Sequence, residues 1–167
     1  MTGKGDIALR IWGPIESIDP PARCYEYDQL LTMARIMLRD RKARFPDLVA
    51  AGQMATEDAA AEIAAFEDLV ADWTFIASRT REGEPSNGMS TWALRKYLDT
   101  AIETAADIAR DRGGFDRKLH AKTECVIALR WHLEPGRDTV AMARFSQQLR
   151  DDARAAQASR EPATSCH

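Results

Sequence analysis

Apolar side chains in this chain recur three or four residues apart in successive blocks, and glycine or proline separates the blocks. That spacing places side chains on one face of an α-helix. Alanine is abundant and β-branched residues are few after the first twenty positions, which favours helix over sheet. The sequence therefore predicts an all-α fold of about five helices, in a compact bundle built from helical hairpins.

Proline, glycine and capping residues set the expected helix boundaries. Pro46 is expected to stop the first helix, because the residue before a proline avoids the α region. Gly52 and Gly113 suit left-handed turns, and Thr56 and Ser90 are expected N-caps. The predicted helices span residues 28–44, 56–78, 91–112, 116–133 and 138–156. The expected core stripes of the last three are Leu94, Leu98, Ile102, Ala105 and Ala109, then Leu119, Lys122, Val126, Leu129 and Leu133, and finally Val140, Phe145 and Leu149.

The first 25 residues differ from the rest of the chain. Gly-Pro and Pro-Pro pairs in this stretch mark turns and extended chain. Residues 1–25 are therefore predicted to form an extended N-terminal arm, with room for one short strand. Its Ile11, Trp12 and Ile15 either pack on the helices or belong to a partner-binding arm.

The helical domain is expected to cover residues 26–156 in two parts. A polar stretch with glycine and proline, residues 83–88, separates a hairpin at 26–79 from a three-helix part at 89–156. The small and polar residues 157–167 are expected to form a flexible tail.

Net charge and cysteine usage narrow the class of protein. The formal net charge is −3, whereas a protein that coats duplex DNA is normally strongly basic. Three cysteines without CxxC spacing indicate free thiols rather than a disulfide scaffold. The N-terminus lacks the apolar core of a signal peptide, and apolar runs are too short to span a membrane. We therefore expect a cytoplasmic protein with no membrane association.

Charge is segregated between the first two predicted helices. The first is basic near its C-terminal end, and the second is acidic, with no basic residue before Arg79. In an antiparallel hairpin these faces support one another as a solvated surface. Alternatively, the basic end binds a phosphate backbone or an acidic protein, or the acidic face occupies a basic groove. The candidate partner-binding residues are Arg39, Arg41, Lys42, Arg44, Glu62 and Asp68.

Two tryptophans are further candidates for partner binding. Trp92 lies in the first turn of the third predicted helix, and Trp131 lies off the main stripe of the fourth. Tryptophan is enriched among interface hot spots, which makes each a candidate exposed anchor. Core packing is the competing interpretation for both.

No complete catalytic or metal-site motif is present in the sequence. His120 and Glu124 share a helix face beside Cys125, but a zinc site needs three or four ligands. His132 lies about a third of a turn off that face. An exposed His–Glu pair and a buried free cysteine are the expected roles. There is also no phosphate-loop motif. We predict no catalytic residue, metal or cofactor.

Residues 37–73 carry a distinctive hairpin pattern. A basic helix end leads into Phe45-Pro46, then V-x-A-G-x-M ends at Met54, and an Ala-rich acidic helix follows through Trp73. This pattern resembles small uncharacterised helical proteins of proteobacterial phages and prophages, with Phe-Pro in place of the more usual Tyr-Pro. The resemblance covers this stretch only, and it implies a phage or prophage origin more than any activity.

One leading hypothesis and two alternatives follow. The leading hypothesis is a non-enzymatic, phage- or prophage-encoded protein that binds a host or phage protein, for example an inhibitor of a host defence system such as an anti-CRISPR. The first alternative is a nucleic-acid-associated accessory protein that uses the basic helix end. The second is a helical enzyme or nucleotide-binding protein with a site between helices. Apolar stripes on five helices either close a monomer core or leave a face for self-association.

Overall fold

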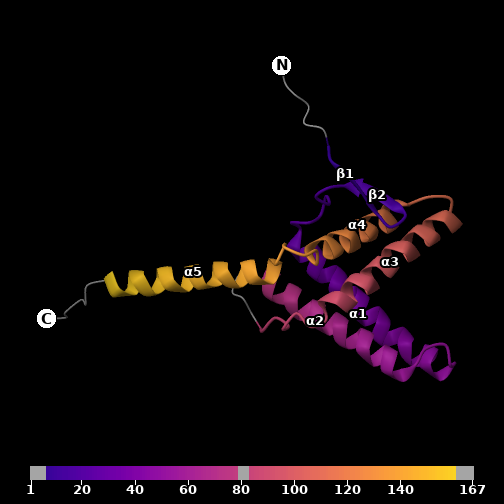
Figure 1. Cartoon of the computed structure of the whole chain (residues 1–167), viewed down its shortest axis with the longest axis horizontal. Helices are drawn as coiled ribbons and strands as arrows, with labels where there is room; N and C mark the ends of the chain where they lie inside the picture. Colours follow the sequence, from indigo (N-terminus) through magenta and orange to yellow (C-terminus); the bar gives the residue numbers. More distant parts are fainter. Residues whose placement is uncertain (1–6, 79–82, 161–167) are drawn as a thin grey trace, which may run out of the picture.

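A computed structural model describes residues 7–78 and 83–160 of the chain. These residues form two short strands and then five helices (Figure 1), which confirms the predicted helical fold. The elements are β1 (Leu9–Trp12), β2 (Ile15–Ile18), α1 (Tyr27–Ala50), α2 (Thr56–Ala77), α3 (Thr91–Asp111), α4 (Arg117–His132) and α5 (Thr139–Arg160). Residues 1–6 of the predicted arm, 79–82, and 161–167 of the predicted tail lie outside the described residues.

The N-terminal arm contains a β-hairpin, where the sequence suggested at most one strand. β1 and β2 pair antiparallel, with Trp12 opposite Ile15, and the turn between them passes through Gly13 at φ +58°. Side chains alternate between the two faces of a strand. Trp12 is therefore buried and Ile15 packs on the core, whereas Ile11 is 70% exposed and does not pack on the helices.

α1 continues through Pro46, so the prediction that this proline ends the helix is wrong. A proline inside a helix removes one backbone donor, and here the neighbouring Phe45 is buried and holds the segment against the core. The helix ends at Ala50, and Gly52, just after the C-cap residue Ala51, has φ +70°. Gln53 N–H donates to the Leu48 carbonyl at 2.9 Å, as in a Schellman cap.

The two predicted N-caps do not cap through their side chains. Ala55, and not Thr56, holds the N-cap position of α2. Ser90 holds the N-cap position of α3 as predicted, but its hydroxyl donates to Asp68 Oδ2 at 2.5 Å and so ties α3 to α2 instead of capping its own helix. Gly113 has φ +81° just after α3, as expected for a helix that ends in a left-handed glycine.

α4 is the central helix of the fold. α1 and α2 form the predicted hairpin, α3 and α4 form a second one, and α4 packs against both α1 and α3. The β-hairpin adds a further contact, because Ser17 Oγ donates to Glu124 at 3.3 Å. Burial in the second half of α4 extends all round the helix and includes Val126, Ile127 and Leu129. The single apolar stripe predicted for this helix therefore underestimates its burial.

α5 leaves the four-helix body formed by α1–α4. Figure 1 shows it extending outward from its junction with α2. Ala143 is the one buried residue of α5, and Phe145 and Leu149 of the predicted stripe are 58% and 54% exposed. This part of the predicted bundle is therefore not packed on the core. The predicted tail also starts too early, because α5 continues to Arg160.

Candidate functional site

A groove lies between the α1–α2 hairpin and the α3–α4 hairpin. The two hairpins diverge on this side of the molecule (Figure 1). This inter-hairpin groove has a volume of about 640 Å³. Its floor is formed by four buried core residues, Met33, Met37, Phe45 and Val126. Binding sites are typically concave and mostly apolar, and this groove has both properties.

The middle of the α3 wall consists of small side chains, namely Thr100, Ala101, Thr104 and Ala105, and the larger Tyr97 and Ile108 flank them. α3 buries the neighbouring helical stripe that ends in Ala106 and Ala109. Ala105, predicted to belong to the core stripe, is therefore half-buried and faces the groove. Small side chains on this wall allow the backbone of a bound helix to approach closely, since interaxial distance depends on the side chains in contact.

The opposite wall belongs to the stretch 37–54 that carries the hairpin pattern. Leu48 and Met54 provide apolar surface on this side, and Gln53 adds an amide. Methionine is unbranched and polarisable, so it adapts to differently shaped partners. The hairpin pattern of this stretch therefore shapes one side of the groove as well as the turn.

The charged side chains that line the inter-hairpin groove comprise three cations and two acids, namely Arg41, Arg44, Lys122, Asp40 and Glu62. Arg41 Nε donates to Glu62 Oε1 at 2.8 Å, and the Arg41 guanidinium lies 3.8 Å over the Phe66 ring, so this cation is neutralised and half-buried. Arg44 on α1 and Lys122 on α4 are exposed and form no ion pair with the other described residues. These two cations face the groove from opposite sides and would attract an acidic ligand.

The remaining charged candidates lie outside the groove. Lys42 pairs with Glu67 at 3.2 Å, which places the basic end of α1 beside α2 as predicted for an antiparallel hairpin. Arg39 is 72% exposed and contacts its neighbour Asp40 at 3.3 Å. Asp68 accepts the Ser90 hydroxyl. Of the predicted charged residues, the fold thus gathers Arg41, Arg44 and Glu62 at one site.

The two candidate tryptophans have opposite environments. Trp92 is 66% exposed, and Lys96 Nζ lies 4.1 Å from its ring, so core packing is wrong for Trp92. Trp131 is 8% exposed, and the Arg137 guanidinium covers its ring at 3.5 Å. The exposed-anchor interpretation of Trp131 is therefore wrong. The cause is the central position of α4, which buries side chains off its main stripe as well.

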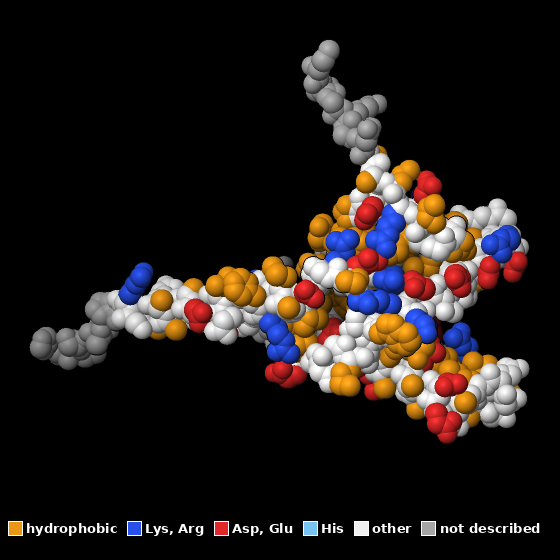
Figure 2. All heavy atoms as spheres, viewed as in Figure 1, with side chains coloured by type: hydrophobic (Ala, Val, Ile, Leu, Met, Phe, Trp, Pro, Cys, Tyr) orange, Lys and Arg blue, Asp and Glu red, His pale blue; other side chains and the backbone are white. Residues whose placement is uncertain are grey.

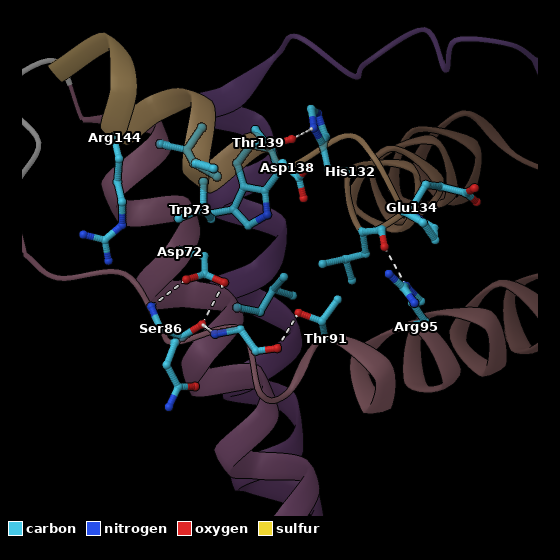
Figure 3. Close-up of a pocket in the computed structure, with 18 residues that line it drawn as sticks. Asp72, Trp73, Ser86, Thr91, Arg95, His132, Glu134, Asp138, Thr139 and Arg144 are labelled. Carbon is cyan, nitrogen blue, oxygen red and sulfur yellow. Dashed lines mark hydrogen bonds between the residues drawn. The ribbon is translucent and has the colours of Figure 1, made fainter. Parts of the chain in front are cut away.

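A second hollow of about 440 Å³ lies where α2, α3, α4 and α5 meet (Figure 3). Asp72 on α2 accepts the Ser86 backbone N–H at 2.7 Å and the Ser86 hydroxyl at 3.0 Å. Burial raises the pKa of Asp72, and the hydrogen bonds from Ser86 partly oppose this rise. On the other side, Arg95 Nε donates to the Leu133 carbonyl at 2.6 Å. These groups hold the segment before α3 and the end of α4 in place.

His132 closes the second hollow and was missed as a key residue by sequence reasoning. Its Nε2 lies 2.6 Å from the Cys24 carbonyl, and its Nδ1 lies 2.7 Å from Thr139 Oγ1. A carbonyl only accepts, so Nε2 carries the proton and neutral His132 accepts the Thr139 hydroxyl at Nδ1. Burial lowers the pKa of His132. The apolar run around His132 in the sequence is the signal that could have indicated its burial.

Several polar groups of the second hollow thus bind one another and hold together the junction of α2, α3, α4 and α5. The predicted exposed pair on α4 is only half exposed: His120 Nε2 lies 3.7 Å from Glu124 Oε1, and the His120 side chain is 64% exposed whereas that of Glu124 is 12% exposed. Cys125 is buried with a free thiol, as expected. Within residues 7–78 and 83–160, no cluster of three histidine, cysteine or acidic side chains could hold a metal ion.

The inter-hairpin groove is the better candidate for a binding site, because its floor is apolar and its rim carries two exposed cations, Arg44 and Lys122, that form no ion pair with the other described residues. Among the described helices, none has the length and apolar character needed to cross a membrane. No protein-family model matches the chain, and no curated protein and no solved structure matches it either.

Proposed function

We propose that this protein is a non-enzymatic binding protein that takes an acidic amphipathic helix of a partner protein into the inter-hairpin groove. The observation that carries the proposal is the combination of an apolar floor with the two exposed cations Arg44 and Lys122 at the rim. An amphipathic helix lays its apolar face into such a groove, and acidic residues on its flanks complement the rim.

The charge pairing within the α1–α2 hairpin favours a protein partner over nucleic acid. Arg41 is occupied by Glu62, and Lys42 is occupied by Glu67. Two of the four basic residues proposed for phosphate contacts are therefore neutralised by α2. A nucleic-acid surface would need several free cations to gain affinity from counterion release.

The resemblance of residues 37–73 to phage and prophage proteins suggests where the partner belongs. The groove wall and the resembling stretch share Leu48 and Met54, so the pattern that suggests a phage origin also shapes the proposed site. We propose, as the specific form of the function, an inhibitor of a host defence system such as an anti-CRISPR. Its acidic helix target would then be a subunit of that system.

Filling the groove tests the binding mode. Thr104→Trp places a large ring at the exposed α3 wall, and Ala61→Trp places the same ring on the outer face of α2, away from the groove. Each protein is used to capture partners from host lysate. We expect the wild type and Ala61→Trp to retain the same partner and Thr104→Trp to lose it. Equal capture by both variants would contradict a groove interface.

Charge reversal tests the proposed chemistry of the partner. Arg44→Glu with Lys122→Glu reverses both rim cations, and Arg35→Glu with Lys118→Glu reverses two exposed cations on the same helices outside the groove. We expect the first pair to weaken capture strongly and the second pair to leave it nearly unchanged. Retention of nucleic acid by all variants, with no protein partner, would support the accessory-protein alternative instead.

The anti-defence role has its own test. Host cells with an active defence system are infected by a sensitive phage, with and without expression of this protein. We expect the plaque count to rise with wild-type protein and not with Thr104→Trp. If plaque counts are unchanged across several defence systems while capture succeeds, the binding proposal stands and the anti-defence proposal fails.

A further inference from the structure

α5 carries an apolar stripe that the described chain does not cover. Met142, Phe145 and Leu149 are 59%, 58% and 54% exposed, and Figure 2 shows apolar side chains along the length of this helix. Their spacing of three and four residues places them on one face. Ala153 and Ala156 continue the same face toward the C-terminal end of α5.

This stripe faces away from the four-helix body. Ala143 is buried and Val140 packs on the core, and both lie on the other side of the helix by its 100° step per residue. Arg150 and Arg154 also lie on the body side, because they line a hollow next to the acidic start of α1. The stripe is thereby left free of cations, and an exposed apolar surface of this kind indicates an interaction site.

The side chains of the stripe are large in its N-terminal part and small in its C-terminal part, and this pattern indicates which partner can pack on it. Leu149 is central, Phe145 and Ala153 lie four residues to either side of it, and Met142 and Ala156 lie seven residues to either side. We propose that α5 pairs antiparallel with α5 of a second copy of this chain, with the two-fold axis at Leu149. Phe145 then lies opposite Ala153 of the other copy, Met142 lies opposite Ala156, and the two Leu149 side chains meet at the axis.

The antiparallel arrangement is favoured over a parallel one by packing. Large side chains opposite small ones interdigitate and fill space, whereas a parallel pair would set Phe145 against Phe145 and leave a gap between the alanines. The interface is isologous, so it closes as a dimer instead of growing into a filament. Three large side chains per copy form a small interface, below the roughly 1,200 Å² of a stable complex, so we expect a reversible dimer.

The oligomeric state is measured by sedimentation equilibrium over a wide concentration range. We expect the wild type to dimerise reversibly and Leu149→Asp to be monomeric, with a dimer Kd that rises by about tenfold or more. Ala155→Asp is the matched control, because it adds the same charge at an exposed position of α5 off the stripe. A wild type that stays monomeric throughout, or a control that dissociates as fully as Leu149→Asp, would overturn the proposal.

Disulfide cross-linking tests the direction of the helices. The variants carry Cys166→Ser, and the remaining native thiols, Cys24 and Cys125, are buried. We expect a mixture of Phe145→Cys and Ala153→Cys proteins to cross-link to each other faster than either protein cross-links to itself, and Leu149→Cys to cross-link alone. Faster self-cross-linking of Phe145→Cys would indicate a parallel pair and overturn the antiparallel arrangement.

Discussion

α4 and α5 come from the same alanine-rich chain and end in opposite environments. Eight of the 16 residues of α4 are buried, compared with one of the 22 residues of α5. The longer helix is the less buried one, so helix length does not determine burial. α4 is covered by α1, α3 and the β-hairpin, whereas α5 contacts the body through its junction with α2. An apolar stripe therefore identifies the face of a helix that favours burial. Whether other elements of the same chain pack on that face depends on the tertiary arrangement.

The largest expected loss of stability comes from a substitution in the core of the four-helix body. Trp73 is 2% exposed and packs beside Tyr27 and His132 in the core. Trp73→Ala should lower the free energy of unfolding by about 3–5 kcal/mol, because it leaves a cavity that the neighbours fill only in part. Urea unfolding followed by circular dichroism measures this change. A loss below about 1 kcal/mol would mean that the body is loosely packed.

His132 is expected to make the stability of the body depend on pH. Burial lowers its pKa, so between its usual value of about 6.5 and this lower value the unfolded chain binds more protons than the folded chain. The free energy of unfolding should therefore fall as the pH falls below about 6.5. His132→Gln cannot titrate and should lack this part of the decrease.

Comparing the two proteins isolates His132 from Asp72, whose contribution has the opposite sign. Burial raises the pKa of Asp72, so the folded chain binds more protons near and above the usual carboxyl value. That contribution is common to the wild type and His132→Gln and cancels in their difference. Parallel pH profiles for the two proteins would contradict the neutral, buried state assigned to His132.

Two arginines of α1 allow the contributions of a half-buried and an exposed ion pair to stability to be compared within one helix. Arg41 is half-buried, donates to Glu62 and stacks on Phe66, so Arg41→Ala should lower the free energy of unfolding by about 1–2 kcal/mol. Arg39 forms an exposed pair, and Arg39→Ala should change it by no more than about 0.5 kcal/mol. Thermal unfolding at low and moderate salt measures both, and equal losses would contradict this assignment.

The smallest expected effect is on α5. Phe145→Ala removes an aromatic ring that is 58% exposed and should change the stability of the monomer by no more than about 0.5 kcal/mol. The measurement is urea unfolding at a concentration below the dimer range. A loss as large as that of Trp73→Ala would show that Phe145 is packed within the monomer and would remove the contrast between the two regions.

Local sequence signals predicted the elements well and the assembly only in part. The stripe of Leu94, Leu98 and Ile102 indicated the buried side of α3 correctly, because helical spacing alone determines which side chains share a face. Pro46 was misleading, since burial of the adjacent Phe45 compensates for one lost backbone hydrogen bond. Ser90 marked the N-cap position of α3 correctly, but its hydroxyl bonds to Asp68 instead of capping the helix.

The candidate site was less predictable than the fold. Arg44 and Lys122 are far apart in sequence, and only the divergence of two hairpins places them on one rim. Glu62 was identified as a charged candidate, but its pairing with Arg41 depends on the register of α1 against α2. Spacing within a helix carries no information about such a register, so the groove could not be derived from the sequence.

The bridge made by His132 has a consequence for how distant parts of the chain communicate. One ring binds Cys24, just before α1, and Thr139, the first residue of α5. Release of either segment removes a hydrogen bond that helps to fix the ring for the other, so the two opening reactions are thermodynamically coupled. Coupling of this kind is reciprocal. An event that steadies α5 should therefore slow amide hydrogen exchange around Cys24, and an event that frees the N-terminal segment should loosen α5.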